Sequence, residues 1–171
     1  TCGWMKGGLA HVNIFGSVIF AGMSGTAIAD AAGLGTIEIK AMRKAGFDPA
    51  FAAAVSASSA IIGPIIPPSV IMVIYGVLAQ VSIGDLFLAD IVPGVVIGLL
   101  LMATVYLLVV TRRVVAPVQP KASRTVLWRT FVAAIPPLLA PIILMVGLLT
   151  GIATPTELGA LTVVYSAFLG F

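Results

Sequence analysis

The chain has 171 residues, of which 60% are apolar and 9% charged, and its mean hydropathy is +1.20. Soluble domains carry charge on about a quarter of their residues, so this composition excludes a soluble domain and indicates an integral membrane protein. The net charge of +3 does not indicate a nucleic-acid partner, because the basic residues flank apolar stretches instead of alternating with exposed aromatic residues.

Three features of the chain as a whole limit its interpretation. Cys2 is the single cysteine, which excludes an internal disulfide and a Cys-x-x-Cys redox motif. Apolar stretches recur along the whole chain, so none of them has the pattern of a cleavable leader. The chain begins at Thr1 rather than Met and stops at Phe171 within an uncharged stretch, so we expect a piece of a longer protein.

The first apolar stretch, residues 12–35, is interrupted at residues 23–26 and is either one crossing or a hairpin. Ser24, Gly25 and Thr26 would give a flexible turn with two hydroxyls and free backbone groups. Non-helical backbone at membrane depth must be buried in protein or line a wet cavity. The alternative is that these small residues only allow close helix packing.

The next stretch, residues 49–84, is uncharged and well beyond the roughly 20 residues that one helical crossing needs. It contains GPIIPPSV at residues 63–70, and we expect a helix broken at residues 63–68. Each proline lacks an N–H, so Pro64, Pro67 and Pro68 are predicted to free the carbonyls of Ala60, Gly63 and Pro64. Such carbonyls bind cations in the discontinuous helices of secondary transporters. The alternative is a plain proline kink.

Charges delimit two further stretches, residues 91–111 and 130–156, each long enough to cross a bilayer. If residues 12–35 form a hairpin and the later stretches cross in turn, the positive-inside rule is satisfied. The acidic side then carries Asp85, Asp90 and Glu157. The cytoplasmic side carries all the basic residues: Lys6, Lys40, Arg43, Lys44, Arg112, Arg113, Lys121, Arg124 and Arg129. If residues 12–35 crossed fully, Lys6 would be the single exception.

Residues 20–76, FAGMSGTAIADAAGLGTIEIKAMRKAGFDPAFAAAVSASSAIIGPIIPPSVIMVIYG, closely resemble the large membrane subunit of tripartite ATP-independent periplasmic (TRAP) transporters. The motifs FLADIVPG and GIATPTELGA extend the resemblance over most of residues 7–171. It implies an all-α polytopic membrane protein, part of an inverted-repeat elevator-type transporter with a re-entrant hairpin and a broken transmembrane helix. It also implies a bacterial inner-membrane permease that imports organic acids, such as C4-dicarboxylates or sialic acid, with Na+ as the coupling ion. The implied partners are a small membrane subunit and a periplasmic substrate-binding protein.

The resemblance also divides the chain into parts. Residues 1–111 would hold the hairpin, the broken helix and the following transmembrane helix of the first-half transport region. Residues 112–130 would be a basic cytoplasmic connection, lying against anionic lipid headgroups. Residues 131–171 would begin the second half with further transmembrane helices. A second hairpin and broken helix of the inverted repeat are absent from this sequence.

Carried onto this sequence, the resemblance assigns one sodium site between the hairpin tip and the broken helix. Its implied ligands are the Ser24 side chain and the backbone carbonyls of Gly63, Ile66 and Pro68. Four further residues are implied to lie close to the substrate: Gly25, Thr26, Pro67 and Ser69.

Two acids remain to be interpreted. Asp30 lies just after the hairpin tip, and intramembrane acids are functional suspects by default; we favour a structural role, with Asp30 either solvated or paired with Lys40 or Arg43. Glu157 follows Thr154 by three residues, which predicts a capping box at a helix start rather than a transport residue.

Other function classes fit the residues less well. A membrane-embedded enzyme needs a polar catalytic set within the spans, and the sequence shows none. An ATP-driven pump needs a phosphate loop, which is also missing, and a channel more often repeats a short filter across subunits. A sodium/dicarboxylate symporter without a binding protein is the remaining alternative, and the tip sequence SGT favours the TRAP family over it.

Overall fold

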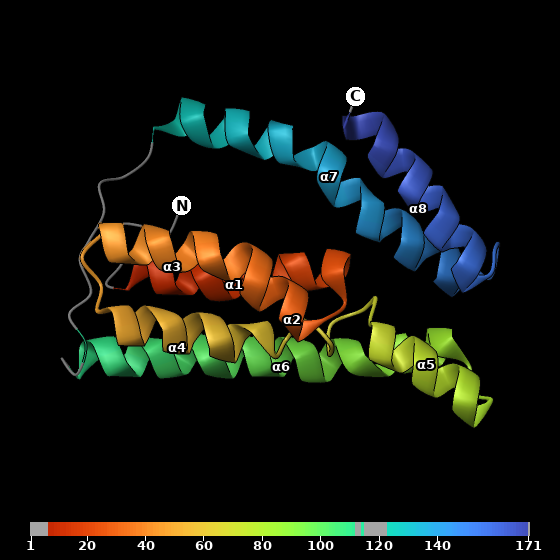
Figure 1. Ribbon diagram of the computed structural model, residues 1–171, viewed down its shortest axis with the longest axis horizontal. Helices are drawn as coiled ribbons and strands as arrows, with labels where there is room; N and C mark the ends of the chain where they lie inside the picture. The colour runs from red at the N-terminus through yellow and green to blue at the C-terminus, as the bar shows by residue number, and fades with distance from the viewer. Residues whose placement is uncertain (1–6, 112–113, 115–122, 171) are drawn as a thin grey trace. The chain divides into compact units, whose positions relative to one another are not determined.

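The computed structural model describes residues 7–111, 114 and 123–170, and all the regular structure in these ranges is helical (Figure 1). The chain divides into two compact units, Thr1–Lys121 and Ala122–Phe171. The first unit contains every residue that the sequence assigns to the sodium site.

The first unit begins with a helical hairpin. Helix α1 (Gly8–Ser24) ends at Gly25, whose φ of 59° lies in the left-handed region. The chain then reverses into α2 (Ala27–Ala29), the π-helical turn η1 (Asp30–Leu34) and α3 (Gly35–Lys44). The predicted break at residues 23–26 is thus confirmed as a helix–turn–helix, while the π-helical turn was not expected.

A helix broken in its middle follows the hairpin. Helix α4 (Pro49–Ala60) starts with proline at its first position, and its cap Asp48 accepts from the Phe51 N–H at 3.0 Å. After the irregular residues 61–69, α5 (Val70–Ala79) starts at Ser69, whose hydroxyl accepts from the Met72 N–H at 3.3 Å. The predicted break at residues 63–68 is therefore confirmed.

The long helix α6 (Ile83–Val110) then runs back along both halves of the broken helix (Figure 1). By length and composition it is able to cross a membrane. The uncharged stretch predicted to cross, residues 91–111, covers the C-terminal part of this helix, which begins earlier than the stretch does. Ser82 caps the helix by accepting from the Asp85 N–H at 3.3 Å, so Asp90 lies inside α6.

The two halves of the broken helix pack differently. Helix α4 contacts both α1 and α3 of the hairpin, whereas the main contacts of α5 are with α6. The hairpin consequently runs beside α4, and its tip lies at the break (Figure 1). Ile14, Ile62 and Val105 from α1, the break and α6 are buried together in the core of this unit.

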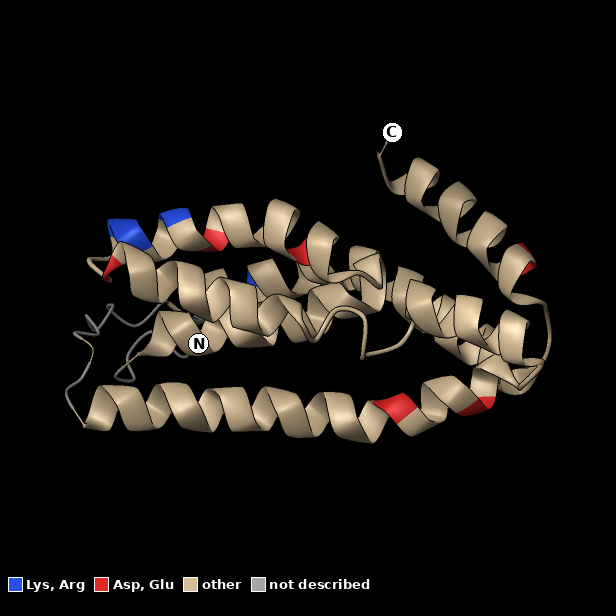
Figure 2. Cartoon of the chain, turned by 60° about the horizontal axis from the view of Figure 1, so that its bottom comes forward, with Lys and Arg blue, Asp and Glu red and all other residues tan. Residues whose placement is uncertain are grey.

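The basic residues of the first unit gather at one end, where the acids Glu38 and Asp48 also lie. Arg43 and Lys44 lie in the last turn of α3, and Figure 2 shows basic residues at that end of the hairpin and the acids of α6 towards the far end of the unit. The topology predicted from the basic residues stays a prediction. Lys6, Arg112, Arg113 and Lys121, which belong to the same prediction, lie outside the described residues.

The second unit is a pair of helices, α7 (Arg124–Thr150) and α8 (Pro155–Gly170). The Tyr165 hydroxyl of α8 donates to the Pro136 carbonyl of α7 at 2.9 Å. The span predicted at residues 130–156 is shifted, because α7 starts at Arg124 and Gly151 ends it with a left-handed φ of 68°. Helix α7 is the second helix long and apolar enough to cross a membrane.

The predicted capping box at the start of α8 is confirmed. The Thr154 N–H and the Thr154 hydroxyl both donate to the Glu157 carboxylate at 2.8 Å, and the Glu157 N–H donates back to the Thr154 hydroxyl at 3.4 Å. These bonds, the backbone one first, hold the pKa of Glu157 below its ordinary value. Glu157 therefore caps the start of α8.

Candidate functional site: the hairpin tip at the helix break

The hairpin tip and the helix break are in direct contact. The Val70 N–H at the start of α5 donates to the Gly25 carbonyl at 3.4 Å. A Cβ added to Gly63 would lie 2.9 Å from the Thr26 carbonyl oxygen, so the break also approaches the tip at its first residue. The structure thus brings together the two segments that the sequence assigned to one site.

Gly25 is the residue that allows this contact. A Cβ at this position would lie 2.5 Å from the Pro68 carbonyl oxygen and 3.2 Å from the Val70 nitrogen. Its backbone conformation is also one that residues with side chains rarely adopt. Glycine is therefore needed at the tip for two separate reasons, the turn itself and the close approach to the break.

Four helix ends meet where the tip touches the break. Helices α1 and α4 end there at Ser24 and Ala60, whereas α2 and α5 begin there, after Thr26 and Ser69. Helix C-termini carry partial negative charge and helix N-termini partial positive charge. The same small volume therefore offers a favourable environment for a cation and, beside it, for an anion.

The proline argument from the sequence was right for one of its three carbonyls. The Ala60 carbonyl accepts from the Gly63 N–H at 3.0 Å, because the chain tightens into a turn after α4. The Pro64 carbonyl accepts from the Ser69 hydroxyl at 2.6 Å. The prediction that these two carbonyls are free was wrong. Of the three, the Gly63 carbonyl is the one without a donor among the described residues.

The backbone acceptors assigned as sodium ligands fit that role. The carbonyls of Gly63, Ile66 and Pro68 accept no hydrogen bond from any residue that the structure describes. Unpaired backbone carbonyls are rare in buried positions and are the ligands that hard cations prefer. Gly63 is buried, and Ile66 and Pro68 are half-buried.

The side chains assigned to the site have different local roles. The half-buried Ser24 hydroxyl donates to the Thr26 carbonyl at 3.5 Å and keeps its lone pairs free. The Thr26 hydroxyl accepts from the Ala29 N–H at 3.2 Å, and the buried Ser69 hydroxyl caps α5 and bonds Pro64. Pro67 is buried beside them. Ser69 is thus held by two structural bonds, while Gly25 and Thr26 lie at the contact itself.

A chain of buried polar side chains joins the hairpin to α4, and the sequence did not predict it. The Asn13 amide donates to the Ser56 hydroxyl at 2.6 Å, the Ser59 hydroxyl donates to the Asn13 side-chain oxygen at 2.9 Å, and Ser17 donates to Ser59 at 3.0 Å. We call these four residues the polar seam. Satisfied buried networks of this kind fix one packing arrangement.

Asp30 lies beside the polar seam and contradicts the sequence interpretation. Its side chain is 1% exposed, so it is not solvated, and within the described residues neither carboxylate oxygen has a hydrogen-bond partner. Lys40 and Arg43 are exposed and do not pair with it. The two predicted surroundings of Asp30, solvent or an ion pair with Lys40 or Arg43, were therefore wrong, while its structural role stays a prediction.

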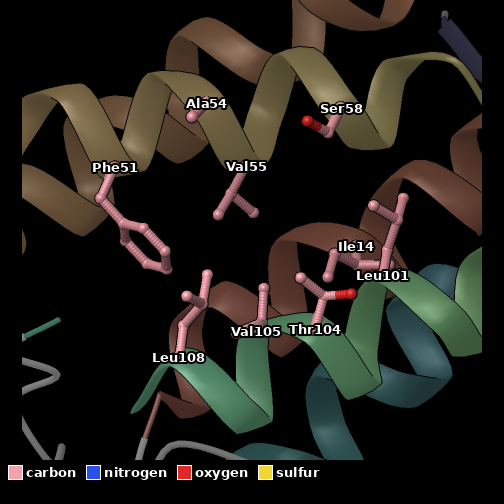
Figure 3. Close-up of a pocket in the computed structure, with 9 residues that line it drawn as sticks. All are labelled: Ile14, Phe51, Ala54, Val55, Ser58, Leu101, Thr104, Val105 and Leu108. Carbon is pink, nitrogen blue, oxygen red and sulfur yellow. The ribbon is translucent and has the colours of Figure 1, made fainter. Parts of the chain in front are cut away.

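A separate apolar cavity of about 140 Å³ lies between α4 and α6 (Figure 3). Its polar groups are the hydroxyls of Ser58 and Thr104, and the Thr104 hydroxyl is bonded to the Leu100 carbonyl at 2.8 Å. No charged residue lines it. The cavity does not have the chemistry to recognise an organic acid, so Ser58 is a useful control position.

The family model of the DctM component of tripartite ATP-independent periplasmic transporters matches residues 1–171. The chain belongs to this family. It is 45% identical over 168 residues to the sialic acid TRAP transporter permease protein SiaT of Haemophilus influenzae, covering 98% of this chain and 27% of that protein. It is 46% identical to the sialic acid TRAP transporter large permease protein SiaM of Vibrio cholerae, covering 98% of this chain and 39% of that protein.

The match extends to relatives with other substrates in their names. The chain is 39% identical over 167 residues to the 2,3-diketo-L-gulonate TRAP transporter large permease protein YiaN of Escherichia coli, covering 98% of this chain and 39% of that protein. Each of these names describes a transporter permease. The chain spans between 27% and 39% of the length of these relatives. The resemblance found in the sequence is thereby confirmed as family membership.

Proposed function

We propose that this chain is the part of a TRAP large permease that binds the coupling sodium ion and drives import of an organic acid. The observation that carries the proposal is the contact between the hairpin tip and the helix break, with the Val70 N–H donating to the Gly25 carbonyl at 3.4 Å. The protein would act as a secondary transporter and not as an enzyme.

The sodium proposal rests on the chemistry of the described residues. Ser24 and the carbonyls of Gly63, Ile66 and Pro68 would hold the ion, because these carbonyls have no donor and the C-termini of α1 and α4 end beside them. A bound sodium ion would supply the positive charge that holds these oxygens together.

The substrate proposal rests on the helix N-termini that meet at the same place. Helices α2 and α5 begin beside Thr26 and Ser69, and helix N-termini favour carboxylate groups. The relatives named above carry sialic acid or 2,3-diketo-L-gulonate in their names, and both are acids. We therefore propose a carboxylate-bearing substrate of this class, with Gly25 and Thr26 closest to it and Pro67 shaping the break.

The placement in the membrane is part of the same proposal. The hairpin lies beside α4 and its tip stops at the break, as a hairpin that enters and leaves by one face would do (Figure 1). A multi-pass position in the bacterial inner membrane fits the two helices able to cross it. A small membrane subunit, a periplasmic substrate-binding protein and the lipid bilayer would be the partners, and nucleic acid would not. Family membership does not favour the symporter that works without a binding protein.

The test measures sodium dependence of uptake by the full-length permease, reconstituted with its partner subunits. Ser24→Ala removes a side-chain ligand, and Pro67→Ala with Pro68→Ala restores two N–H donors that let the helix close over the Gly63 carbonyl. Both variants should raise the sodium concentration for half-maximal uptake, on the order of tenfold, as expected when one bond to a charged group is lost.

Ser58→Ala in α4 is the matched control, because it also removes one serine hydroxyl but faces the apolar cavity (Figure 3). Its sodium dependence should stay at the wild-type value. If Ser24→Ala and the double proline variant insert normally and also keep the wild-type sodium dependence, the residues 63–70 are a plain kink and the site assignment is wrong.

A further inference from the structure

Asp30 is the one carboxylate of the hairpin that is almost wholly inaccessible, with 1% of its surface exposed. Its backbone N–H donates to the Thr26 carbonyl at 3.3 Å, but in the described part of the chain its two carboxylate oxygens accept no hydrogen bond. An isolated buried carboxylate is strongly disfavoured unless a positive charge meets it. The fold nevertheless keeps this one at the start of η1, a π-helical turn of a kind frequent at functional sites.

The neighbouring Ser17 can offer Asp30 one proton at most. The Ser17 side chain lies beside the carboxylate, and its hydroxyl also lies 3.0 Å from the Ser59 hydroxyl, so the two acceptors compete for the same proton. Ser59 in turn uses its own proton to bond the Asn13 side-chain oxygen at 2.9 Å. A hydroxyl has one proton and two lone pairs, whereas the two carboxylate oxygens of Asp30 offer about four acceptor sites. Acceptors therefore outnumber donors around Asp30, and a positive charge fits beside the carboxylate and the Ser17 oxygen.

Glu38 is a second acid of the hairpin near Asp30. The side chain of Glu38 reaches across to α1, where a Cβ on Gly16 would meet its Oε1 at 2.6 Å, and it interacts electrostatically with Asp30. The nearest basic residues along α3, Lys40 and Arg43, are exposed on its surface. Two acids thus lie on the α1 side of the hairpin, and within the described residues the Asp30 carboxylate has no hydrogen-bonding cationic partner.

We propose that the Asp30 carboxylate and the Ser17 hydroxyl oxygen bind a sodium ion inside the hairpin, at a site separate from the one at its tip. This proposal rests on sodium coupling as set out above. Carboxylate and hydroxyl oxygens are the ligands that hard cations prefer. The ion neutralises Asp30 and completes the polar seam, so it stabilises the hairpin against α4.

The test is direct binding of radioactive sodium-22 to the purified full-length permease with its small subunit. Asp30→Asn keeps the size of the side chain but removes the charge, and it should bind one sodium ion fewer per permease than the wild type. Ser17→Ala should weaken one of the sodium sites on the order of tenfold, as expected for loss of one bond to a charged group. It serves as the second variant if Asp30→Asn is poorly produced.

Asp85→Asn is the matched control, because Asp85 is an exposed acid in the first turn of α6 and its removal changes the net charge by the same amount. It should bind as many sodium ions as the wild type. If Asp30→Asn also binds the full number while Ser17→Ala keeps the wild-type affinity, the proposal is overturned, and a proton neutralises Asp30 instead.

The same binding measurement distinguishes the inner sodium site at Asp30 from the proposed sodium site at the hairpin tip. Ser24→Ala addresses the tip alone, so a double variant of Ser24→Ala with Asp30→Asn should lose sodium binding additively if the two sites are separate. Loss of one ion in Asp30→Asn alone supports the inner site whether or not Ser24→Ala changes uptake. Equal binding in the single and double variants would show one shared site and refute the inner one.

Discussion

Replacement of Gly25 by alanine should separate the hairpin tip from the helix break. The new Cβ would lie 2.5 Å from the Pro68 carbonyl oxygen, so the tip must retreat by roughly 1 Å to reach van der Waals separation. The hydrogen bond from Val70 to the Gly25 carbonyl is already 3.4 Å long and would break. The left-handed φ of 59° adds strain of about 1–2 kcal/mol for any residue with a side chain.

Gly151 provides a control that isolates the contact from the strain. It has the same left-handed conformation, with a φ of 68°, but a Cβ there would meet nothing within 4 Å. Gly151→Ala should therefore lower stability by about 1–2 kcal/mol and leave sodium dependence unchanged. Gly25→Ala should carry the same strain and also raise the sodium concentration for half-maximal uptake on the order of tenfold or more.

The assay is uptake across a sodium titration by the reconstituted full-length permease, together with thermal unfolding of the purified protein. The two variants should differ in their sodium dependence far more than in their unfolding temperatures. If Gly25→Ala behaves like Gly151→Ala in both measurements, the close contact between tip and break has no role in sodium binding.

Three further outcomes are expected. Asn13→Ala should destabilise the full-length permease by about 1–3 kcal/mol, because buried hydroxyls of the polar seam lose their partner. Thermal unfolding measures this, and an unchanged unfolding temperature would contradict it. Glu157→Gln should keep most uptake, because glutamine also completes a capping box. Complete loss of uptake at normal protein level would show a transport role. In the native protein the cap should weaken as the pH falls through the lowered pKa of Glu157. In a Cys2-free permease, cysteines placed at Lys44 and Asp85 should be labelled from opposite faces of the membrane, and labelling from one face would exclude the proposed topology.

The interruptions of the helices were predictable, because they depend on residues within the interrupted segments themselves. Proline and glycine act on the backbone of their own segment, so residues 63–68 and the turn at Gly25 could be placed without any tertiary contact. The capping box at Thr154 and Glu157 is likewise a local pattern of fixed spacing. Each of these features appears in the structure at the predicted residues.

The state of individual carbonyls was less predictable. The proline argument counted donors missing from an ideal α-helix, but the chain after Ala60 leaves the helix and finds other donors. Gly63 turns its N–H back to Ala60, and the Ser69 side chain reaches Pro64 across the break. A sequence shows which N–H is lost at a proline but not which side chain replaces it.

The hydrogen bonds of the polar seam and the burial of Asp30 could not be predicted without the tertiary structure. Asn13 and Ser17 lie in α1, while their partners Ser56 and Ser59 lie in α4, and nothing in either segment marks the other as its partner. Asp30 could be noticed as an acid within an apolar stretch, but its lack of a partner depends on how η1 and α1 pack.

In the first unit the hairpin is bonded more firmly to α4 than to α5. This difference suits a coupling site. The hairpin is tied to α4 by the buried hydrogen bonds of the polar seam, at 2.6–3.0 Å, whereas at its tip a single 3.4 Å bond joins it to α5. Helix α5 packs chiefly on α6 instead. A cation bound between tip and break would therefore strengthen the weakest connection of the unit rather than one that is already firm. Because a ligand shifts a conformational equilibrium only through contacts that differ between the states, this is the place where sodium binding can act most strongly on the arrangement of α5.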